Sequence, residues 1–308
     1  MSKIVVIGSC CIDFQTYAPR LPKPGETLHG TKFATGFGGK GANQCVAAAK
    51  LGGNAYMICR LGDDQWGEKY KENFLQYNID TTYTFTTPNV TTGIAQIAVA
   101  DSGENQIVIV PGANNYLSKE DVKNSAELIQ DADILIAQLE TPIETTLEAF
   151  KMAKGITLLN AAPAQDCINE VLPYCTILCV NETEASLLTN IEVDITNAVN
   201  ALKKLLESGC ETVIITMGSD GAVYWSKHDQ QPVHVFCEKV VPVDTTGAGD
   251  AFVGALATYL VTHKEKPLHQ IVGAACHVAT FSVAKQGTQN SYPDKIDAFN
   301  KDYKYVNM

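Results

Sequence analysis

The stretch IVVIG, residues 4–8, is a run of β-branched residues that ends in glycine. An uninterrupted run of this kind predicts a strand buried on both faces, as in the middle of a parallel sheet. Similar apolar runs recur along the chain, at residues 55–62, 132–140, 156–162, 175–182 and 212–218.

Helical patterns separate these runs. They occupy residues 42–52, 67–78, 141–155, 182–190 and 196–209. Strand and helix therefore alternate from end to end, which predicts an α/β fold: a doubly wound, mostly parallel sheet with helices on both faces. We expect one domain over residues 1–308, with ligands beyond the carboxyl ends of the strands.

Two segments break the alternation. Residues 14–37 and 92–111 are short alternating strands joined by turns rich in proline, glycine and polar residues. This pattern is typical of β-hairpins. We expect the two segments to form a small accessory β-sheet that acts as a lid.

Composition excludes several classes of function. The formal net charge is −11 and no basic run is present, which argues against a nucleic-acid partner. No apolar stretch approaches the length of a membrane span, and the apolar run at the start is too short for a signal peptide. The ten cysteines lack zinc-ligand spacing, so we expect reduced thiols in a cytoplasmic protein, with the nucleus as an alternative compartment.

The stretch GFGGKGANQ, residues 36–44, contains the G-x-G-x-x-G pattern of dinucleotide-binding folds. In such folds the glycines follow the first strand directly, whereas here about 28 residues intervene. Asp63 stands where an acidic ribose ligand would be needed, so an NAD-binding oxidoreductase stays open as an alternative. The other interpretation is a loop that opens a helix near Ala42 and directs Lys40 and Asn43 at a polar ligand.

The second glycine-rich stretch is VDTTGAGDAFVGAL, residues 243–256. Small residues at Gly247, Ala248 and Gly249 precede a helical pattern, so the backbone N–H groups of residues 247–250 are expected to form an anion site. Asp250 fits a group that holds a nucleophilic hydroxyl beside a transient anion, although it could also be an ordinary acidic residue of a first helical turn. Next to a helix N-terminus its carboxylate is expected to stay ionised at neutral pH.

These motifs resemble the ribokinase-like, or PfkB, family of ATP-dependent sugar and nucleoside kinases. The resemblance extends over essentially the whole chain and rests on GFGGKGANQ at 36–44, AQLETP at 137–142, VNETEA at 180–185, ITMGSDG at 215–221, DTTGAGDAF at 244–252 and KQGTQNSYP at 285–293. It implies transfer of a phosphoryl group from ATP to O5 of D-ribose, giving D-ribose 5-phosphate and ADP. Another sugar or a nucleoside as acceptor, or a non-catalytic sugar-binding regulator, remains an alternative.

The resemblance also implies roles for individual residues. Those matched to the sugar are Asp13, Gly39, Lys40, Asn43, Glu140 and Asp250, and those matched to catalysis are Gly247, Ala248, Gly249 and Asp250. Those matched to the nucleotide are Asn181, Thr216, Met217, Gly218, Ser219, Asp220, Gly221, Gly249 and Asp250. Glu184 matches a position that organises Mg²⁺ through water, and a K⁺ activator is implied at Asp244, Thr246, Ser282, Lys285, Gly287 and Ser291.

Two further points follow from the resemblance. Many members of the family carry Asn two residues before the first aspartate, where this chain has Cys11, so one expected amide contact with the sugar is missing. The lid sheet often joins two subunits in the family, which implies a homodimer.

Overall fold

A ten-stranded sheet forms the centre of the computed structural model, which describes residues 2–308 apart from the side chains of residues 166 and 167. From edge to edge the strands are β14 (Tyr305–Asn307), β13 (Val233–Val235), β12 (Ala222–Ser226), β11 (Thr212–Thr216), β10 (Ile177–Asn181), β9 (Ile156–Asn160), β8 (Ile134–Ala137), β1 (Lys3–Ile7), β4 (Asn54–Gly62) and β5 (Thr84–Thr87). Neighbours from β11 to β5 are parallel. The strands β12, β13 and β14 extend the sheet in antiparallel fashion.

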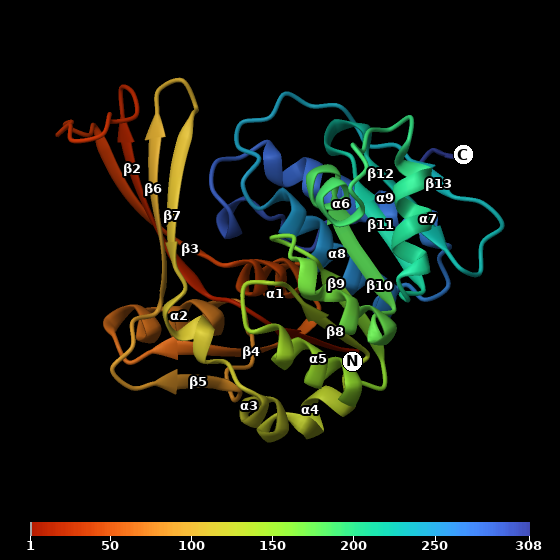
Figure 1. Cartoon of the computed structure of the whole chain (residues 1–308), viewed down its shortest axis with the longest axis horizontal. Coiled ribbons are helices and arrows are strands. Elements are labelled where there is room, and N and C mark those ends of the chain that lie inside the picture. Colours follow the sequence, from red (N-terminus) through yellow and green to blue (C-terminus); the bar gives the residue numbers. More distant parts are fainter. Residues whose placement is uncertain (1) are drawn as a thin grey trace.

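Helices cover both faces of this sheet (Figure 1). Because successive side chains of a strand point to opposite faces, Ile4 and Val6 of β1 join one core and Val5 and Ile7 the other. The first core includes residues of α1 (Lys40–Lys50), α2 (Gln65–Gln76), α8 (Ala248–Thr262) and α9 (Leu268–Val283). The second includes residues of α3 (Lys119–Asn124), α4 (Ala126–Gln130), α5 (Ile143–Met152), α6 (Glu182–Thr189) and α7 (Ala198–Glu207).

The prediction of a doubly wound, mostly parallel sheet is confirmed. All six apolar runs of the sequence are strands of the parallel part. The strands that the sequence patterns did not indicate are β5 and the antiparallel edge β12–β14. Their sequences, TFTT, AVYWS, VHV and YVN, lack the continuous aliphatic run that marks the parallel strands.

The lid is a separate four-stranded sheet in the order β3–β2–β6–β7. Its strands are β2 (Cys11–Ala18), β3 (Lys32–Gly38), β6 (Gly93–Ala100) and β7 (Asn105–Val110). The two hairpins β2–β3 and β6–β7 are antiparallel and join through the parallel pair β2–β6. The sheet projects away from the central layers (Figure 1), and its strands lie within residues 11–38 and 93–110. That it closes over a ligand as a lid stays a prediction.

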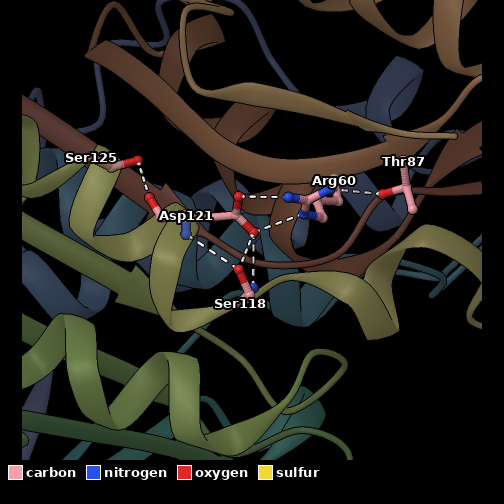
Figure 2. Close-up of polar contacts among 5 residues, drawn as sticks. All are labelled: Arg60, Thr87, Ser118, Asp121 and Ser125. Atoms are coloured by element: carbon pink, nitrogen blue, oxygen red, sulfur yellow. Dashed lines mark hydrogen bonds and ion pairs between the residues drawn. The ribbon is translucent and has the colours of Figure 1, made fainter.

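A buried ion pair anchors the chain where it returns from the lid to the central layers (Figure 2). Arg60 of β4 donates two hydrogen bonds to the Asp121 carboxylate of α3, at 2.7 and 2.8 Å, and a third to Thr87 Oγ1 of β5 at 3.1 Å. Asp121 also accepts from Ser118 in a capping box at the start of α3. Removing Arg60 would leave the Asp121 carboxylate, whose side chain is only 3% exposed, without its ionic partner, which costs about 3–5 kcal/mol for a buried charge.

Within residues 2–308, no helix combines the length and the apolar character that crossing a membrane would need.

Candidate functional site

The predicted sites come together at the carboxyl edge of the parallel strands. Ser9 follows β1, Glu140 follows β8, and Asn160 and Asn181 end β9 and β10. The N-terminal ends of α1 and α8 meet at the same edge, since Asn43 of α1 is hydrogen-bonded to Asp250 of α8. This is the place where open α/β sheets bind their ligands.

The glycine loop opens α1, as predicted, but it follows lid strand β3 and not β1. Gly39 precedes the helix with φ of 90°, and a Cβ atom there would lie 2.7 Å from the Cys11 nitrogen, so glycine is required. The first amides of α1 are already bonded: Lys40 N–H to Glu140 Oε2, Gly41 N–H to Ser9 Oγ and Ala42 N–H to Ser9 O. The loop therefore offers no row of unbonded amides for a pyrophosphate.

Side chains on this side of the site carry several charges close together. Glu140 Oε2 accepts from Ser9 Oγ at 2.5 Å as well as from Lys40 N–H at 3.0 Å. Burial lowers the pKa of the Lys40 ammonium, but Asp250, Glu140 and Glu184 attract the charged form strongly enough to leave that pKa raised. Lys40 is therefore held as a cation among carboxylates.

Asp13 of β2 faces the same carboxylates. Burial, followed by repulsion from Glu140 and Asp250, raises the pKa of Asp13 to about 7. At neutral pH this carboxyl group is thus poised between a hydrogen-bond donor and an acceptor. Cys11, at the start of the same strand, is buried, and its Sγ accepts from Asn114 Nδ2 at 3.6 Å.

Asp250 lies in the first turn of α8 and is almost fully buried. Its Oδ2 accepts from Asn43 Nδ2 and its Oδ1 from Gln44 Nε2, both at 2.9 Å. Burial raises the pKa of Asp250, while Lys40, Asn43 and Gln44 act against the rise. The sequence led us to expect the helix N-terminus to govern this pKa, but burial is the largest influence because the group has lost its contact with water.

The predicted anion site at the start of α8 is smaller than expected. Ala248 N–H donates to Thr245 O at 3.2 Å, which closes the turn before the helix and removes one of the four amides. Among residues 2–308, the N–H groups of Gly247, Gly249 and Asp250 have no protein partner. Orphan amides of this kind at a helix start are suited to an anion.

A polar cavity of about 170 Å³ lies beside these amides. Its lining includes Lys40, Asn160, Asn181, Glu184, Thr216, Gly247, Gly249 and Asp250. Asn181 and Glu184 form a capping box at the start of α6: Asn181 Oδ1 accepts from Glu184 N–H, and Glu184 Oε2 accepts from Asn181 N–H. Burial raises the pKa of Glu184.

A second, more apolar cavity of about 280 Å³ shares Thr216 and Gly249 with the first. Of the predicted nucleotide residues, Thr216, Gly218, Ser219, Gly221 and Gly249 line it. Met217 and Asp220 are not among its lining residues: Met217 is buried in the second core, and Asp220 forms an ion pair with Lys239 at 3.6 Å. Their assignment to the nucleotide stays a prediction. Lining residues absent from the predicted set are Cys237, Glu238, Val240, Pro242, Thr245, Phe252, Cys276, Ala279, Thr280 and Val283.

Larger hollows lie elsewhere, but they contain none of the motif residues. One of about 680 Å³ is bordered by Asp131, Lys154 and Lys264, near the opposite ends of the strands, where Lys264 pairs with Asp133. It is a shallow, open surface feature, and the smaller cavities beside Asp250 are the chemically equipped ones.

Asp244 joins the two segments expected to hold K⁺. Its Oδ1 accepts from Thr246 N–H and its Oδ2 from Gly287 N–H, both at 2.9 Å. Lys285 N–H donates to Ser282 O, and Ser291 donates to Thr288 O through both its N–H and its Oγ. Across the described part of the chain, no group of three or more His, Cys, Asp and Glu side chains could hold a metal ion.

Known proteins resemble this chain in sequence and in structure. Residues 1–295 match the pfkB family of carbohydrate kinases. The chain is 46% identical to ribokinase of Mus musculus over 299 residues, which cover 96% of this chain and 93% of that protein. It is 40% identical to deoxyribokinase of Salmonella typhi, with 97% of each chain covered.

Solved structures agree with the sequence relatives. The structure of Arabidopsis thaliana ribokinase complexed with ribose and ATP superposes with a TM-score of 0.85 at 31% identity, covering 96% of this chain and 97% of the other. With the glycine loop, the buried Asp250 and the paired cavities in place, this chain belongs to the pfkB family of carbohydrate kinases.

Proposed function

We propose that the protein transfers the γ-phosphoryl group of ATP to O5 of D-ribose, giving D-ribose 5-phosphate and ADP. The observation that carries the proposal is the position of Asp250, buried between the cluster of Asp13, Glu140 and Lys40 and the cavities at the start of α8. The 46% identity to a ribokinase supports ribose as the acceptor.

The sugar would lie among the groups on the α1 side. Asp13, Lys40, Asn43 and Glu140 supply acceptors and donors for several hydroxyls, and Gly39 allows the backbone to approach. Asp250 would accept a hydrogen bond from the attacking hydroxyl and take its proton as the new P–O bond forms and the bond to ADP breaks. Positioning of this hydroxyl is the larger contribution, because phosphoryl transfer needs little basicity from the enzyme.

ATP would place its phosphates at the start of α8 and its base in the apolar cavity. The N–H groups of Gly249 and Asp250 would donate to the transferring group, and Lys40 would balance its charge. Asn181, Thr216, Gly218, Ser219 and Gly221 border the path of the nucleotide. Closing the lid over the sugar would exclude water and limit hydrolysis of ATP.

Mg²⁺ would accompany ATP. Glu184, which borders the polar cavity and has one oxygen bonded to Asn181 N–H, fits an ion held partly through water. When bound, Mg²⁺ supplies neutralisation of the phosphate charges.

K⁺ would bind behind the anion site. Asp244 ties the loop of Thr246 to the turn of Gly287. This carboxylate and the carbonyls of Ser282, Lys285 and Ser291 would supply the oxygen ligands that suit a weakly hydrated cation. The ion would supply rigidity to the loop that leads into Gly247.

A homodimer would form through the lid. Residues 107–110 of β7 are all more than half exposed although they are Ile, Val, Ile and Val, and β7 is an edge strand. An apolar edge strand of this kind is unfavourable in a monomer, and a second copy would cover it.

None of the nine described cysteines forms a disulfide, which supports a reducing compartment such as the cytoplasm.

The test measures ADP release coupled to each candidate acceptor. D-ribose, 2-deoxy-D-ribose, other pentoses, hexoses and adenosine are compared at saturating ATP, with a reaction lacking acceptor as the control. We expect D-ribose to give the highest kcat/KM. Preference for 2-deoxyribose would favour the activity named for the Salmonella relative, and no acceptor-dependent ADP release would contradict a kinase function altogether.

A further inference from the structure

Buried amide side chains surround Asp250 beyond those already assigned to the sugar. Gln44 of α1 is fully buried, and Gln289, in the short 3₁₀ helix Gln289–Ser291, is 4% exposed. Neither belongs to the predicted site residues, although both stand in family motifs. Each occupies the middle of a chain of hydrogen bonds that ends on one oxygen of Asp250.

The first chain ends on Oδ1. Gln138 Nε2 donates to Gln44 Oε1 at 2.7 Å, and Gln44 Nε2 donates to both Asp250 Oδ1 and Asn160 Oδ1 at 2.9 Å. The second ends on Oδ2. Asn73 Nδ2 donates to Gln289 Oε1, Gln289 Nε2 donates to Asn43 Oδ1, both at 3.0 Å, and Asn43 Nδ2 donates to Asp250 Oδ2 at 2.9 Å.

Asp250 determines which group donates and which accepts along both chains of hydrogen bonds. An ionised carboxylate only accepts hydrogen bonds, so the amide next to it must present N–H and keep its carbonyl for the next donor outward. Gln138 shows the consequence: its Oε1 is buried with no partner among the described residues. A Cβ atom on residue 8 would lie 2.0 Å from that oxygen, so only Gly8 leaves room for Gln138 in this orientation.

We propose that Gln44 and Gln289 are positioning residues, which orient the Asp250 carboxylate toward the attacking hydroxyl by fixing the amides that hold its two oxygens. The inference rests on the proposed kinase function. Gln289 never contacts Asp250, and its influence passes through Asn43. An aspartate held at both oxygens keeps one geometry, and loss of alignment by about 1 Å can lower a rate by about 10²-fold.

The chain through Gln289 allows a sharp experiment. In Gln289→Leu, Asn43 loses a donor but keeps its own bond to Asp250, so we expect a loss in kcat of only a few-fold. In Gln289→Glu, the new carboxylate attracts Asn43 Nδ2, and the carbonyl of Asn43 turns toward Asp250. We expect kcat to fall about tenfold or more, with KM for ATP within about twofold of wild type.

Two additional variants complete the design. Gln44→Leu removes the donor to Oδ1, and kcat is expected to fall about tenfold. Gln270→Leu is the matched control, because Gln270 also bonds through both ends of its amide, to the backbone of Tyr303, but lies outside both chains. Its midpoint of thermal unfolding should fall while kcat stays unchanged.

A double variant at Gln289 and Asn43 distinguishes a positioning role of Gln289 from a role in packing alone. Gln289→Glu should have little further effect on kcat in an Asn43→Ala background, since the path to Asp250 is already broken. Additive losses of kcat in the double variant, or equal kcat in Gln289→Glu and Gln289→Leu, would overturn the inference. If the leucine variants fail to fold, Gln289→Glu still tests it, because glutamate keeps the size of the side chain. A wild-type kcat in Gln289→Glu would then overturn the inference. Absence of acceptor-dependent ADP release by the wild-type protein would instead refute the proposed function, and the inference with it.

Discussion

Two helices of this protein begin after glycine-rich loops at the same edge of the sheet, and they differ in what their first amides contact. At α1, the amides of Lys40, Gly41 and Ala42 are bonded to Ser9 and Glu140. At α8, the amides of Gly249 and Asp250 have no partner among residues 2–308 and border the cavities. A glycine motif at a helix start is therefore an anion site only if the fold leaves its amides unbonded.

The difference divides the site into two parts with different physical character. Around α1, the site presents charged and amide side chains held by buried hydrogen bonds. Around α8 and the apolar cavity, it presents backbone groups and mostly apolar side chains. Substitutions near α1 should therefore change KM for the sugar, and substitutions around α8 should change kcat or KM for ATP.

The largest effect is expected at Asp250. Asp250→Asn keeps the shape of the side chain but removes the acceptor for the hydroxyl proton, and kcat should fall by about 10²-fold or more. ATP binding should persist, because the amides of α8 remain in place. Steady-state kinetics with ribose and titration with a non-hydrolysable ATP analogue measure the two properties, and near wild-type turnover would contradict the assigned role.

The next effect concerns Asp13 and pH. Burial raises the pKa of Asp13 from 3.8 to about 7 in the folded protein. The folded state therefore holds this proton more tightly than the unfolded chain, and stability falls as the pH rises between these two values. Each pH unit in this range should lower the free energy of unfolding by at most about 1.4 kcal/mol relative to Asp13→Asn, or roughly 2 kcal/mol between about pH 5 and 7.

Urea denaturation of the wild-type protein and of Asp13→Asn at several pH values gives the free energy of unfolding that checks this prediction. Glu184 also has a raised pKa, and its influence cancels in the comparison of wild type with Asp13→Asn, because Asp13 is not among the groups that shift it. Asp250 and Asp13 repel each other, so the difference between the two proteins reports on Asp13 together with its repulsion from Asp250. Parallel pH dependence in the two proteins would mean that Asp13 titrates normally.

A smaller effect is expected at Asn43 on α1. Asn43→Ala should raise KM for ribose about tenfold through loss of a buried hydrogen-bonding group, while KM for ATP changes by less than about twofold. Some loss of kcat should accompany it, because Asn43 also holds Asp250. Asn54→Ala, which removes an amide bonded only to Tyr56 Oη, is a control that should change neither KM. Equal weakening for ribose and ATP would place the α1 loop at the nucleotide instead.

The loop before α8 should give an effect of several-fold. Turnover in K⁺ is expected to exceed turnover in Na⁺ at equal ionic strength, because a bound ion would fix the loop that aims the α8 amides. Asp244→Ala should abolish the difference by separating Thr246 from Gly287. Identical rates of the wild-type protein in the two salts would argue that Asp244 only ties the two turns together.

The sequence predicted the parts of this site that lie in short contiguous motifs. Lys40 and Asn43 stand in one loop and Asp250 in another, and the alternation of strands and helices predicted that both loops meet at one edge of the sheet. The nucleotide roles of Met217 and Asp220 stay predictions, because a motif does not give side-chain direction. At a strand end successive side chains point to opposite faces, so Thr216 borders the cavities while Met217 enters the second core.

The amide chains and the apolar cavity could not be predicted in the same way. Gln44, Gln138 and Gln289 lie on separate elements, and their roles depend on hydrogen-bond directions that only the packed structure determines. Residues 237–242 have no regular secondary structure, so no periodicity indicates which of them face a ligand.

The smallest effect is expected at the apolar cavity, at Val240. This side chain lines the cavity but is 46% exposed, so truncation removes only part of the contact of two methyl groups with the base. At about 0.8 kcal/mol for each fully buried CH₂ group, Val240→Ala should raise KM for ATP by roughly twofold to fourfold, with KM for ribose unchanged. Val241→Ala is the matched control, because Val241 is 89% exposed and does not line the cavity. A tenfold rise of KM for ATP in Val240→Ala would mean that the loop of residues 237–242 closes over the bound nucleotide. The α8 part of the site would then be as well ordered as the α1 part, and the physical difference between the two parts would disappear. A KM for ATP equal to that of the control would place the base elsewhere.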